Sequence, residues 1–385
     1  MRRDSARIET SRSHDRGWRR PVRVRSKKRI TSFDIAESAG VSQATVSRAL
    51  RGSPEVCEET RRRVAAAAAA LHYTVDKNAS SLRSKSTGTL ALLFFDDPSP
   101  DDSHINPFFL SMLGSITRSC ARQGYDLLIS FQELERDWHA DFAESKKADG
   151  IILLGYGDYL AQTNRLEKLR TQGTRLVSWG AVRPNQPCII IGCDNFHGGR
   201  SVTEHLLEQG CRHIAFLGDA SHHFPEFQER YRGHQQALHA HGVTPDDALQ
   251  VDAESSQDSG QQAAEILLAR GGKFDAIFAA SDLIAIGAMG ALSAHGIRVP
   301  DDVAVAGFDD IPMAGLVNPP LTTVVQDTRL AGEVLVDSVV RLIRGEPVEG
   351  RILPMRLMVR RSSLWRQEVG APARRRDSRA VARHR

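Results

Sequence analysis

Residues 31–50, TSFDIAESAGVSQATVSRAL, constrain the fold of this chain more than any other segment. Apolar residues recur there at helical spacing on both sides of Gly40, namely Ile35, Ala36, Ala39, Val41, Val46 and Leu50. Glycine adopts the left-handed conformation of a helix C-terminus at little steric cost, so Gly40 predicts the end of a first helix. The short Ala-Gly-Val link then forces the second helix to pack at a steep angle. The segment predicts a helix-turn-helix rather than an ordinary antiparallel helix pair.

Capping residues and a third helix extend this motif. Thr31, with Asp34 three residues later, and Ser42 are expected to cap the two short helices. Residues 58–73, EETRRRVAAAAAALHY, predict a third helix because alanine has the highest helix propensity. We therefore place a helix-turn-helix domain at residues 30–74, followed by a linker at residues 75–88.

Charge is distributed unevenly, although the net charge of the whole chain is only +4. Residues 1–87 contain 20 Lys and Arg against 9 Asp and Glu, a net charge of +11. Residues 371–385 add +5, whereas residues 88–370 carry −12. A basic head on an acidic body suits phosphate binding by one end, because each neutralised phosphate releases counterions.

The two ends of the chain lack apolar periodicity. Residues 1–29 and the basic tail at residues 364–385 are therefore expected to be disordered. Three alternatives remain for residues 1–29: a nonspecific DNA-binding arm, a solubilising tail, or a start codon assigned too far upstream.

Composition argues against several protein classes. The sequence contains no run of about 18 apolar residues, the length needed to span a bilayer. The Arg-rich N-terminus also lacks the apolar segment of a secretory signal. The five cysteines are Cys57, Cys120, Cys188, Cys193 and Cys211. They are scattered without metal-site spacing, so we expect reduced thiols, no metal and a cytoplasmic protein.

From Leu90 onward, short apolar segments alternate with amphipathic ones. Candidate strands form a first series at residues 90–95, 126–130, 151–154, 175–178 and 188–191, and a second at residues 213–217, 276–280, 303–307 and 322–325. Strands that alternate with helices indicate an α/β fold with parallel, doubly wound sheets. We expect two such lobes within residues 89–363. Ligands of these folds bind beyond the carboxyl ends of the strands.

Several sequence blocks, in order, resemble the LacI/GalR (lactose-repressor) family of bacterial regulators. In the helix-turn-helix they are Asp-Ile-Ala, Ala-Gly-Val-Ser and Thr-Val-Ser-Arg. Later blocks include CDNFHGGRSVTEHLLEQGCRHIAFLGD (193–219), RYRGHQQAL (230–238), FAASDLIAIGAMGAL (278–292), IRVPDDVAVAGFDD (297–310), PPLTTVVQD (319–327) and RRSS (360–363). The likeness spans residues 30–363. It implies a DNA-binding regulator with a two-lobed core like that of periplasmic binding proteins.

The resemblance assigns roles within the helix-turn-helix. The N-terminal part of its second helix faces base edges in the major groove. Gln43 can pair with adenine through two hydrogen bonds, Ala44 can touch a thymine methyl, and the family adds Arg48 as a base reader. Thr31, Ser42, Thr45 and Ser47 are expected to hold phosphates. Helix capping and packing are the alternative roles of Thr45 and Ser47.

The linker resembles the family's hinge helix, which folds on DNA and inserts a pair of leucines into the minor groove. Leu82 is the matching leucine, and Ala79 lies three residues earlier on the same helical face. Such an apolar wedge kinks the duplex. The chain departs from the family pattern at Val75 (usually Pro), Asp76 (usually Asn) and Ser80 (often Arg or Gln). Losing the proline removes pre-organisation, so we expect weaker hinge folding.

The resemblance also implies an effector pocket between the lobes, formed by Asn106, Phe108, Ser178, Trp179, Arg230, Ser281, Asp282 and Asp309. Arg230 and Asp309 would clamp sugar hydroxyls, and Phe108 or Trp179 would offer an aromatic face. The alternatives are core packing for the two aromatic residues and a structural helix cap for Asp282. Ser178 stands where many relatives carry Asp, which predicts a different specificity.

The sequence thus predicts a homodimeric repressor of near-palindromic double-stranded DNA, released by a sugar or sugar derivative and needing no cofactor. Three alternatives stay open: a nucleobase effector, a protein co-regulator, or a solute-binding protein without DNA function. A solute-binding protein would have no use for a helix-turn-helix. An enzyme is disfavoured because no Gly-rich phosphate loop or G-x-S-x-G motif occurs, and His222 and His223 lack a third metal ligand. The residues after Ser363 contain no heptad repeat, so we do not expect a coiled-coil tetramer.

Overall fold

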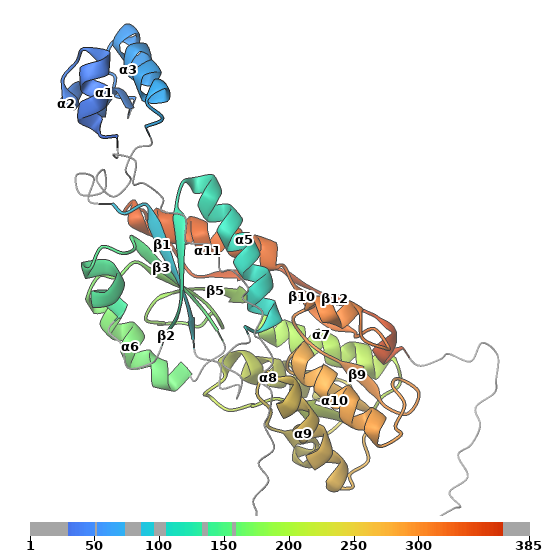
Figure 1. Ribbon diagram of the computed structural model, residues 1–385. Helices are drawn as coiled ribbons and strands as arrows, with labels where there is room; N and C mark the ends of the chain where they lie inside the picture. The colour runs from blue at the N-terminus through green and yellow to red at the C-terminus, as the bar shows by residue number, and fades with distance from the viewer. Residues whose placement is uncertain are drawn as a thin grey trace, which may run out of the picture. The chain divides into compact units, whose positions relative to one another are not determined.

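Figure 1 shows the computed structural model of the chain. It describes residues 30–50, 52–73, 86–95, 105–132, 138–155 and 159–364. The chain divides into two compact units, Met1–Asp76 and Lys77–Arg385.

Three helices form the N-terminal unit: α1 (Ser32–Ala39), α2 (Gln43–Leu50) and α3 (Glu58–Ala70). The predicted turn is confirmed, because Gly40 ends α1 in the left-handed conformation with φ of 63°. The first cap is also confirmed. The amide and the hydroxyl of Thr31 each donate to the Asp34 carboxylate at 2.7 Å.

A small apolar core holds these three helices together. Ile35, Val46 and Val64 contribute one fully buried side chain from each helix. Arg63 on α3 donates to the carbonyl of Ala39 at 2.5 Å, which ties α3 to the end of α1. The third helix is three residues shorter than predicted, because the chain leaves it at His72, whose φ is 47°.

The second unit begins with a six-stranded, all-parallel sheet in the order β11-β5-β4-β3-β1-β2. Its strands are β1 (Thr89–Phe95), β2 (Asp126–Gln132), β3 (Gly150–Leu154), β4 (Leu176–Trp179), β5 (Ile189–Cys193) and β11 (Arg351–Leu353). Helices α5 (Pro107–Gln123), α6 (Tyr159–Thr171) and α11 (Thr328–Ile343) belong to this first lobe. Helices α5 and α11 approach closely at Gly332, where a Cβ would lie 2.6 Å from the Ser115 hydroxyl.

The second lobe contains a four-stranded parallel sheet in the order β7-β6-β8-β9. Its strands are β6 (Ile214–Leu217), β7 (Gln250–Val251), β8 (Ala276–Ala279) and β9 (Ala304–Ala306). Its helices are α7 (Asn195–Glu208), α8 (Pro225–Ala240), α9 (Gln257–Ala269) and α10 (Asp282–Ala294). The predicted fold class, two doubly wound parallel lobes, is confirmed.

Short turns of helix complete the unit: η1 (His139–Glu144, a π-helix), and the 3₁₀ turns η2 (Asp247–Leu249), η3 (Pro312–Gly315) and η4 (Arg361–Ser363). The last of these belongs to the predicted RRSS block. The Ser362 hydroxyl donates to the Val305 carbonyl on β9 at 2.6 Å, so the end of the described chain is tied to the second sheet.

One predicted strand was placed in the wrong sheet. Residues 322–325 were expected in the second parallel series, but β10 (Thr323–Gln326) pairs antiparallel with β12 (Met355–Met358). In the described backbone, its strand pairing with the second lobe is limited to isolated parallel bridges, such as that between Ala306 and Thr322. The reason is the path of the chain. After β10 it crosses to the first lobe as α11 and β11, and β12 then returns beside β10 (Figure 1).

Candidate functional site: a DNA-facing helix and an inter-lobe cluster

Helix α2 buries one face and presents the other to solvent. Val46 and Ala49 are buried, whereas Ala44 and Arg48 are exposed. Gln43 is half-buried, and its Nε2 donates to the Ser32 hydroxyl on α1 at 3.2 Å. The Arg48 guanidinium lies 3.4 Å from the Glu55 carboxylate. Three predicted base readers therefore lie on the face of α2 that does not enter the core.

The residues predicted to hold phosphates lie at the start of the same helices. The Ser42 hydroxyl accepts the Thr45 amide at 3.1 Å, which confirms the second predicted N-cap. The Ser42 and Thr45 hydroxyls also bond to each other at 2.8 Å. Thr31 serves the capping box, and Ser47 is half-buried. The contacts of Thr31, Ser42 and Thr45 are those of helix capping, and phosphate binding stays a prediction for all four residues.

Phe33 is an exposed residue of this surface that the sequence argument missed. It belongs to the first turn of α1, and 70% of it is exposed. An aromatic residue outside the apolar stripe of Ile35 and Ala39 was the available signal. Ala79 and Leu82, the predicted minor-groove residues, lie outside the described residues.

In the second unit, Arg230 is the centre of a buried polar cluster. Its Nε donates to the Asn195 side chain at 2.8 Å, and its Nη1 donates to the Ala280 carbonyl. Its Nη1 also lies 3.6 Å from the Asp309 carboxylate. The guanidinium carbon sits 3.7 Å from the centre of the Phe308 ring. The structure thus brings Arg230 and Asp309 together, as expected for a pair that would bind hydroxyls.

Asp309 occupies a strained position at the end of the loop after β9. Its φ is 116°, which L-residues rarely adopt, and its carboxylate accepts the Gln326 amide at 2.6 Å. Asn195 and Gln326 were missed by the sequence argument. Gln326 is the last residue of β10 and Asn195 lies two residues after β5, so the rule that places ligands near strand carboxyl ends was the available signal.

Asp282 is fully buried beside Asp309. Its carboxylate accepts the Thr323 hydroxyl at 2.5 Å and the Ile311 amide at 2.9 Å. Burial, reinforced by the negative charge of Asp309, raises its pKa well above that of an ordinary aspartate. These bonds join α10 to the loop after β9 and to β10, which favours the structural alternative for Asp282.

Among the remaining predicted residues, Asn106 forms a hydrogen bond that crosses between the lobes. The Asn106 amide donates to the Ser255 hydroxyl at 3.2 Å, and Ser255 donates to the Ser281 hydroxyl at 3.0 Å. Asn106 belongs to the first lobe and caps α5, whereas Ser281 caps α10 in the second. The Phe108 and Trp179 rings lie 6.0 Å apart, and the Ser178 hydroxyl donates to the Trp179 carbonyl at 3.2 Å.

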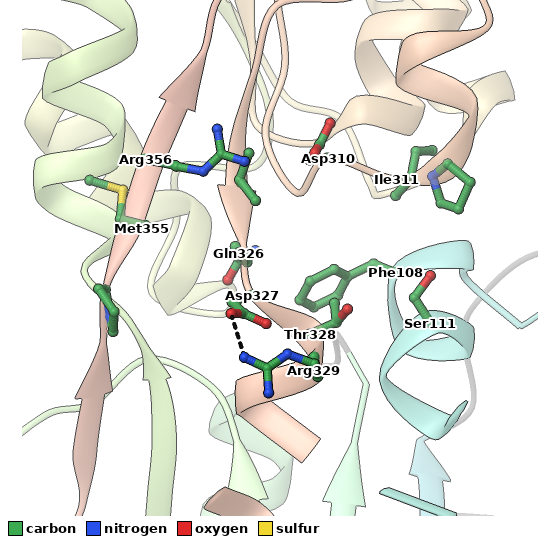
Figure 2. Close-up of a pocket in the computed structure, with 13 residues that line it drawn as sticks. Phe108, Ser111, Asp310, Ile311, Gln326, Asp327, Thr328, Arg329, Met355 and Arg356 are labelled. Carbon is green, nitrogen blue, oxygen red and sulfur yellow. Dashed lines mark ion pairs between the residues drawn. The ribbon is translucent and has the colours of Figure 1, made fainter. Parts of the chain in front are cut away.

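All eight predicted effector residues are buried, with exposures of 6% or less. Phe108 alone among them lines a cavity of about 540 Å³, shown in Figure 2. The other lining residues are Ser111, Asp310, Ile311, Pro312, Val325, Gln326, Asp327, Thr328, Arg329, Pro354, Met355 and Arg356. Gln326 connects this cavity to Asp309. One residue of the cavity wall thus contacts the cluster around Arg230.

The cysteines behave as predicted. All five are free thiols: Cys57 is exposed, Cys188 is half-buried, and Cys120, Cys193 and Cys211 are buried. Burial raises the pKa of Cys193, which adjoins the Arg230 cluster, to about 12, so it stays a neutral thiol. The described residues contain no group of side chains that could hold a metal ion. Within the same residues, no helix combines the length and apolarity needed to cross a membrane.

Comparisons with known proteins agree with the division into a helix-turn-helix and a two-lobed core. Residues 33–76 match the family described as bacterial regulatory proteins, lacI family, and residues 203–363 match the periplasmic binding protein-like domain. The HTH-type transcriptional regulator CelR of Thermobifida fusca is 32% identical over 343 residues, which cover 87% of this chain and 99% of that protein. DegA of Bacillus subtilis (strain 168) is 31% identical over 341 residues, which cover 87% and 98%.

Two solved structures extend the match to the fold. A complex of the regulator CelR with cellobiose shares 31% identity and a TM-score of 0.65, covering 87% of this chain and all of that one. A lac repressor dimer bound to operator and the anti-inducer ONPF shares 27% identity and a TM-score of 0.73, covering 88% and 100%. With a helix-turn-helix, a two-lobed core and relatives matched over nearly their whole length, this chain belongs to the LacI family of transcriptional regulators.

Proposed function

We propose that the protein is a homodimeric repressor that reads a near-palindromic operator and is released by an uncharged carbohydrate. The observation that carries DNA reading is the orientation of α2, which buries Val46 and Ala49 and leaves Ala44 and Arg48 exposed. We assign Gln43, Ala44 and Arg48 to base edges, and Thr31, Ser42, Thr45 and Ser47 to phosphates.

An uncharged effector fits the polar cluster because its charges are already balanced. Arg230 is paired with Asp309, and burial raises the pKa of Asp282, which disfavours a second negative charge beside Asp309. A carbohydrate supplies hydroxyls for Arg230, Asp309 and Asn195 and an apolar ring face for Phe108. The CelR–cellobiose complex supports this class of effector. A nucleobase remains the second candidate, because the relatives include HTH-type repressors named PurR at 29–30% identity.

A dimer is supported by exposed apolar side chains on several elements of the core. Leu316 follows η3 and is 83% exposed, and Leu110 on α5 is 52% exposed. Phe131 on the edge strand β2 is 51% exposed. Exposed apolar side chains contribute to an association surface where they lie in one patch, and two headpieces related by a two-fold axis would read two half-sites. The operator-bound lac repressor dimer offers the same arrangement.

Repression and release would couple the two units through residues 75–88. Effector binding would close the lobes, reorient the paired first lobes and unfold the hinge helices at Leu82 and Ala79. The domain boundaries predicted from the sequence fit this scheme, with a headpiece at residues 30–74 and an effector core at residues 89–363. We place the protein in the cytoplasm, where the chromosome lies, and assign it no enzymatic activity.

The deciding experiment is to incubate the purified protein with fragmented DNA of its source genome and sequence the bound fraction. A pseudo-palindromic motif supports the proposal, and the genes beside it nominate sugars for an effector panel. Enrichment without a motif, lost steeply as salt rises, would mean that the basic head binds only phosphates. If free nucleobases change the occupancy of the motif and no sugar does, the nucleobase is favoured as the effector.

The wedge is tested separately by Leu82→Ala. On the motif recovered above, this variant should lose roughly 1–3 kcal/mol of specific binding free energy, because the unstacked base step loses its apolar partner. An unchanged affinity would show that no minor-groove wedge forms.

A further inference from the structure

Two side chains outside the predicted reading set hold Gln43 and Arg48. We propose that Ser32 and Glu55 are positioning residues that orient these two readers toward adenine and guanine before DNA binds. The inference rests on the proposed function, in which α2 reads base edges. It goes further by naming what decides the strength of base discrimination.

Glu55 engages one edge of the Arg48 guanidinium. The carboxylate lies 3.4 Å from Nε, and the side chains of Arg48 and Glu55 are 54% and 69% exposed. With Nε occupied, the two terminal nitrogens remain free to donate in parallel. That pair of donors matches O6 and N7 of guanine in the major groove.

The loop that carries Glu55 is anchored on both sides. Gly52 adopts φ of 71° and donates to the Ala49 carbonyl at 3.1 Å, while the Ser53 amide donates to the Arg48 carbonyl at 3.0 Å. This pair of bonds closes the end of α2 in the manner of a Schellman motif. The loop therefore returns toward Arg48 by a defined path.

Arg61 of α3 fixes the far side of the same loop. Its Nη2 donates to the carbonyls of Ser53 at 3.2 Å and Val56 at 3.1 Å, and Val56 is itself buried in the core. Glu55 thus lies between two fixed residues. Little backbone entropy is lost when it pairs with Arg48, so even an exposed ion pair can bias the rotamer of the arginine.

Ser32 plays the corresponding part for Gln43. Its hydroxyl accepts one Nε2 hydrogen at 3.2 Å, which sets the amide with Nε2 toward α1. Ser32 is the first residue of α1 and is held next to the Thr31 capping box. The amide oxygen and the second Nε2 hydrogen remain available. Together they match the N6 amino group and N7 of adenine.

Glu55 also has an electrostatic effect of its own. A carboxylate at a DNA-binding surface repels phosphates of every sequence and so weakens nonspecific binding. Positioning alone favours the operator over other DNA, because repulsion weakens binding to every sequence alike. They are separable, because repulsion acts equally on all sequences and positioning acts at a single base pair.

The test uses the full-length protein and the motif selected by the wild type. Affinities are measured by competition for that site and for the three alternative base pairs at each position. The variants are Glu55→Gln and Ser32→Ala. Glu37→Gln and Ser38→Ala, exposed changes of the same kind on α1, serve as matched controls. Arg48→Ala, alone and combined with Glu55→Gln, completes a double-mutant cycle, and thermal melting confirms folding.

We expect Glu55→Gln and Glu37→Gln to raise affinity for all sequences alike. Only Glu55→Gln should reduce the preference for guanine at the Arg48 position, by about two- to fivefold, and it should add no loss in the Arg48→Ala background. Ser32→Ala should reduce the preference for adenine at the Gln43 position in the same range, while Ser38→Ala should not.

If a motif is recovered and both Glu55→Gln and Ser32→Ala keep the base preferences of the wild type, this inference is overturned. The proposed function would still stand. An equal loss of affinity for all sequences, together with a lower melting temperature, would assign Ser32 and Glu55 a purely structural role. A wild type that selects no motif would overturn both the inference and the proposed function.

Discussion

Arg230 shows how a buried charge is accommodated at the scale of one residue. Its guanidinium is 1% exposed, yet it donates to Asn195 and Ala280, pairs with Asp309 and stacks on Phe308. A buried ion is tolerated only where such partners replace water. These partners explain how the fold accommodates the buried charge, and ligand recognition by Arg230 stays part of the proposed function.

Arg230→Ala should abolish the effector response while leaving operator binding intact. The change removes the hydroxyl donor and leaves Asp309 unpaired, so we also expect the core to lose about 3 kcal/mol of unfolding free energy. Effector titration and operator affinity, measured at a temperature where the variant is folded, check this. Arg232→Ala, an exposed change on the same helix, should alter neither. Loss of operator binding together with the response would instead indicate a folding role.

His234 gives the core a predictable acid sensitivity. It is fully buried on α8, its Nδ1 bonds to the Thr203 hydroxyl at 2.9 Å, and burial lowers its pKa from 6.5 to about 3. Between pH 6.5 and 3, the His234 imidazole is therefore protonated in the unfolded chain and neutral in the folded chain. Stability from this group is complete above pH 6.5 and is lost as the pH falls, by about 1.4 kcal/mol per unit.

His234→Gln should flatten that dependence between pH 6.5 and 4. Denaturant unfolding at several pH values measures it, with the exposed His239→Gln on the same helix as control. An equal slope in wild type and His234→Gln would contradict the assignment.

At the scale of elements, the helix-turn-helix depends on one backbone conformation. Gly40 turns the chain with φ of 63°, and a Cβ there would lie 3.4 Å from the Arg63 guanidinium. The turn sets the angle between α1 and α2, and thereby the direction in which Gln43 and Arg48 face. The conformation at Gly40 thus helps to set the orientation of the proposed reading surface.

Gly40→Ala should destabilise the N-terminal unit by about 1–2 kcal/mol, because alanine disfavours the left-handed conformation. Gly40→Asn should lose less, since asparagine tolerates that conformation and introduces the same Cβ. Hydrogen exchange of α1 and α2 amides measures both. Equal losses would mean that contact with Arg63, and not backbone conformation, limits this position.

At the scale of the whole molecule, two lobes are joined by hydrogen bonds such as Asn106–Ser255–Ser281. The chain crosses between the lobes after β5, after β10 and between β11 and β12. In the proposed mechanism, relative movement of the lobes would bend these crossings and so act on the first lobe, which follows residues 75–88 in the chain.

Linkage sets a quantitative expectation for this coupling. If effector weakens operator affinity by a given factor, operator must weaken effector affinity by the same factor. Calorimetric titration of effector with and without saturating operator, compared with operator titration with and without effector, checks the equality. A tenfold effect in one direction without its counterpart would mean that the two ligands do not act on one two-state equilibrium.

Much of this structure could be predicted from the sequence, because the features concerned depend on residues that lie close together in the chain. Helix caps at Thr31 and Ser42, the turn at Gly40 and most strands follow from contacts within a few residues. The position of Arg230 and Asp309 at strand ends follows from the topology of parallel sheets. The roles of the predicted DNA and effector residues remain predictions, and the hinge residues lie outside the described part of the chain.

The sequence by itself determined the helix-turn-helix, its caps, the two-lobed α/β class and the placement of polar residues at strand ends, because these depend on periodicity and local chemistry. The tertiary structure alone decided that β10 pairs with β12, that β11 joins the first sheet, and that Asn195 and Gln326 meet Arg230 and Asp309. It also decided that Ser32 contacts Gln43 and that Glu55 contacts Arg48. These contacts join segments that are separated in the sequence, and each segment could pair with more than one partner. Residue spacing along the chain does not determine which pairing forms.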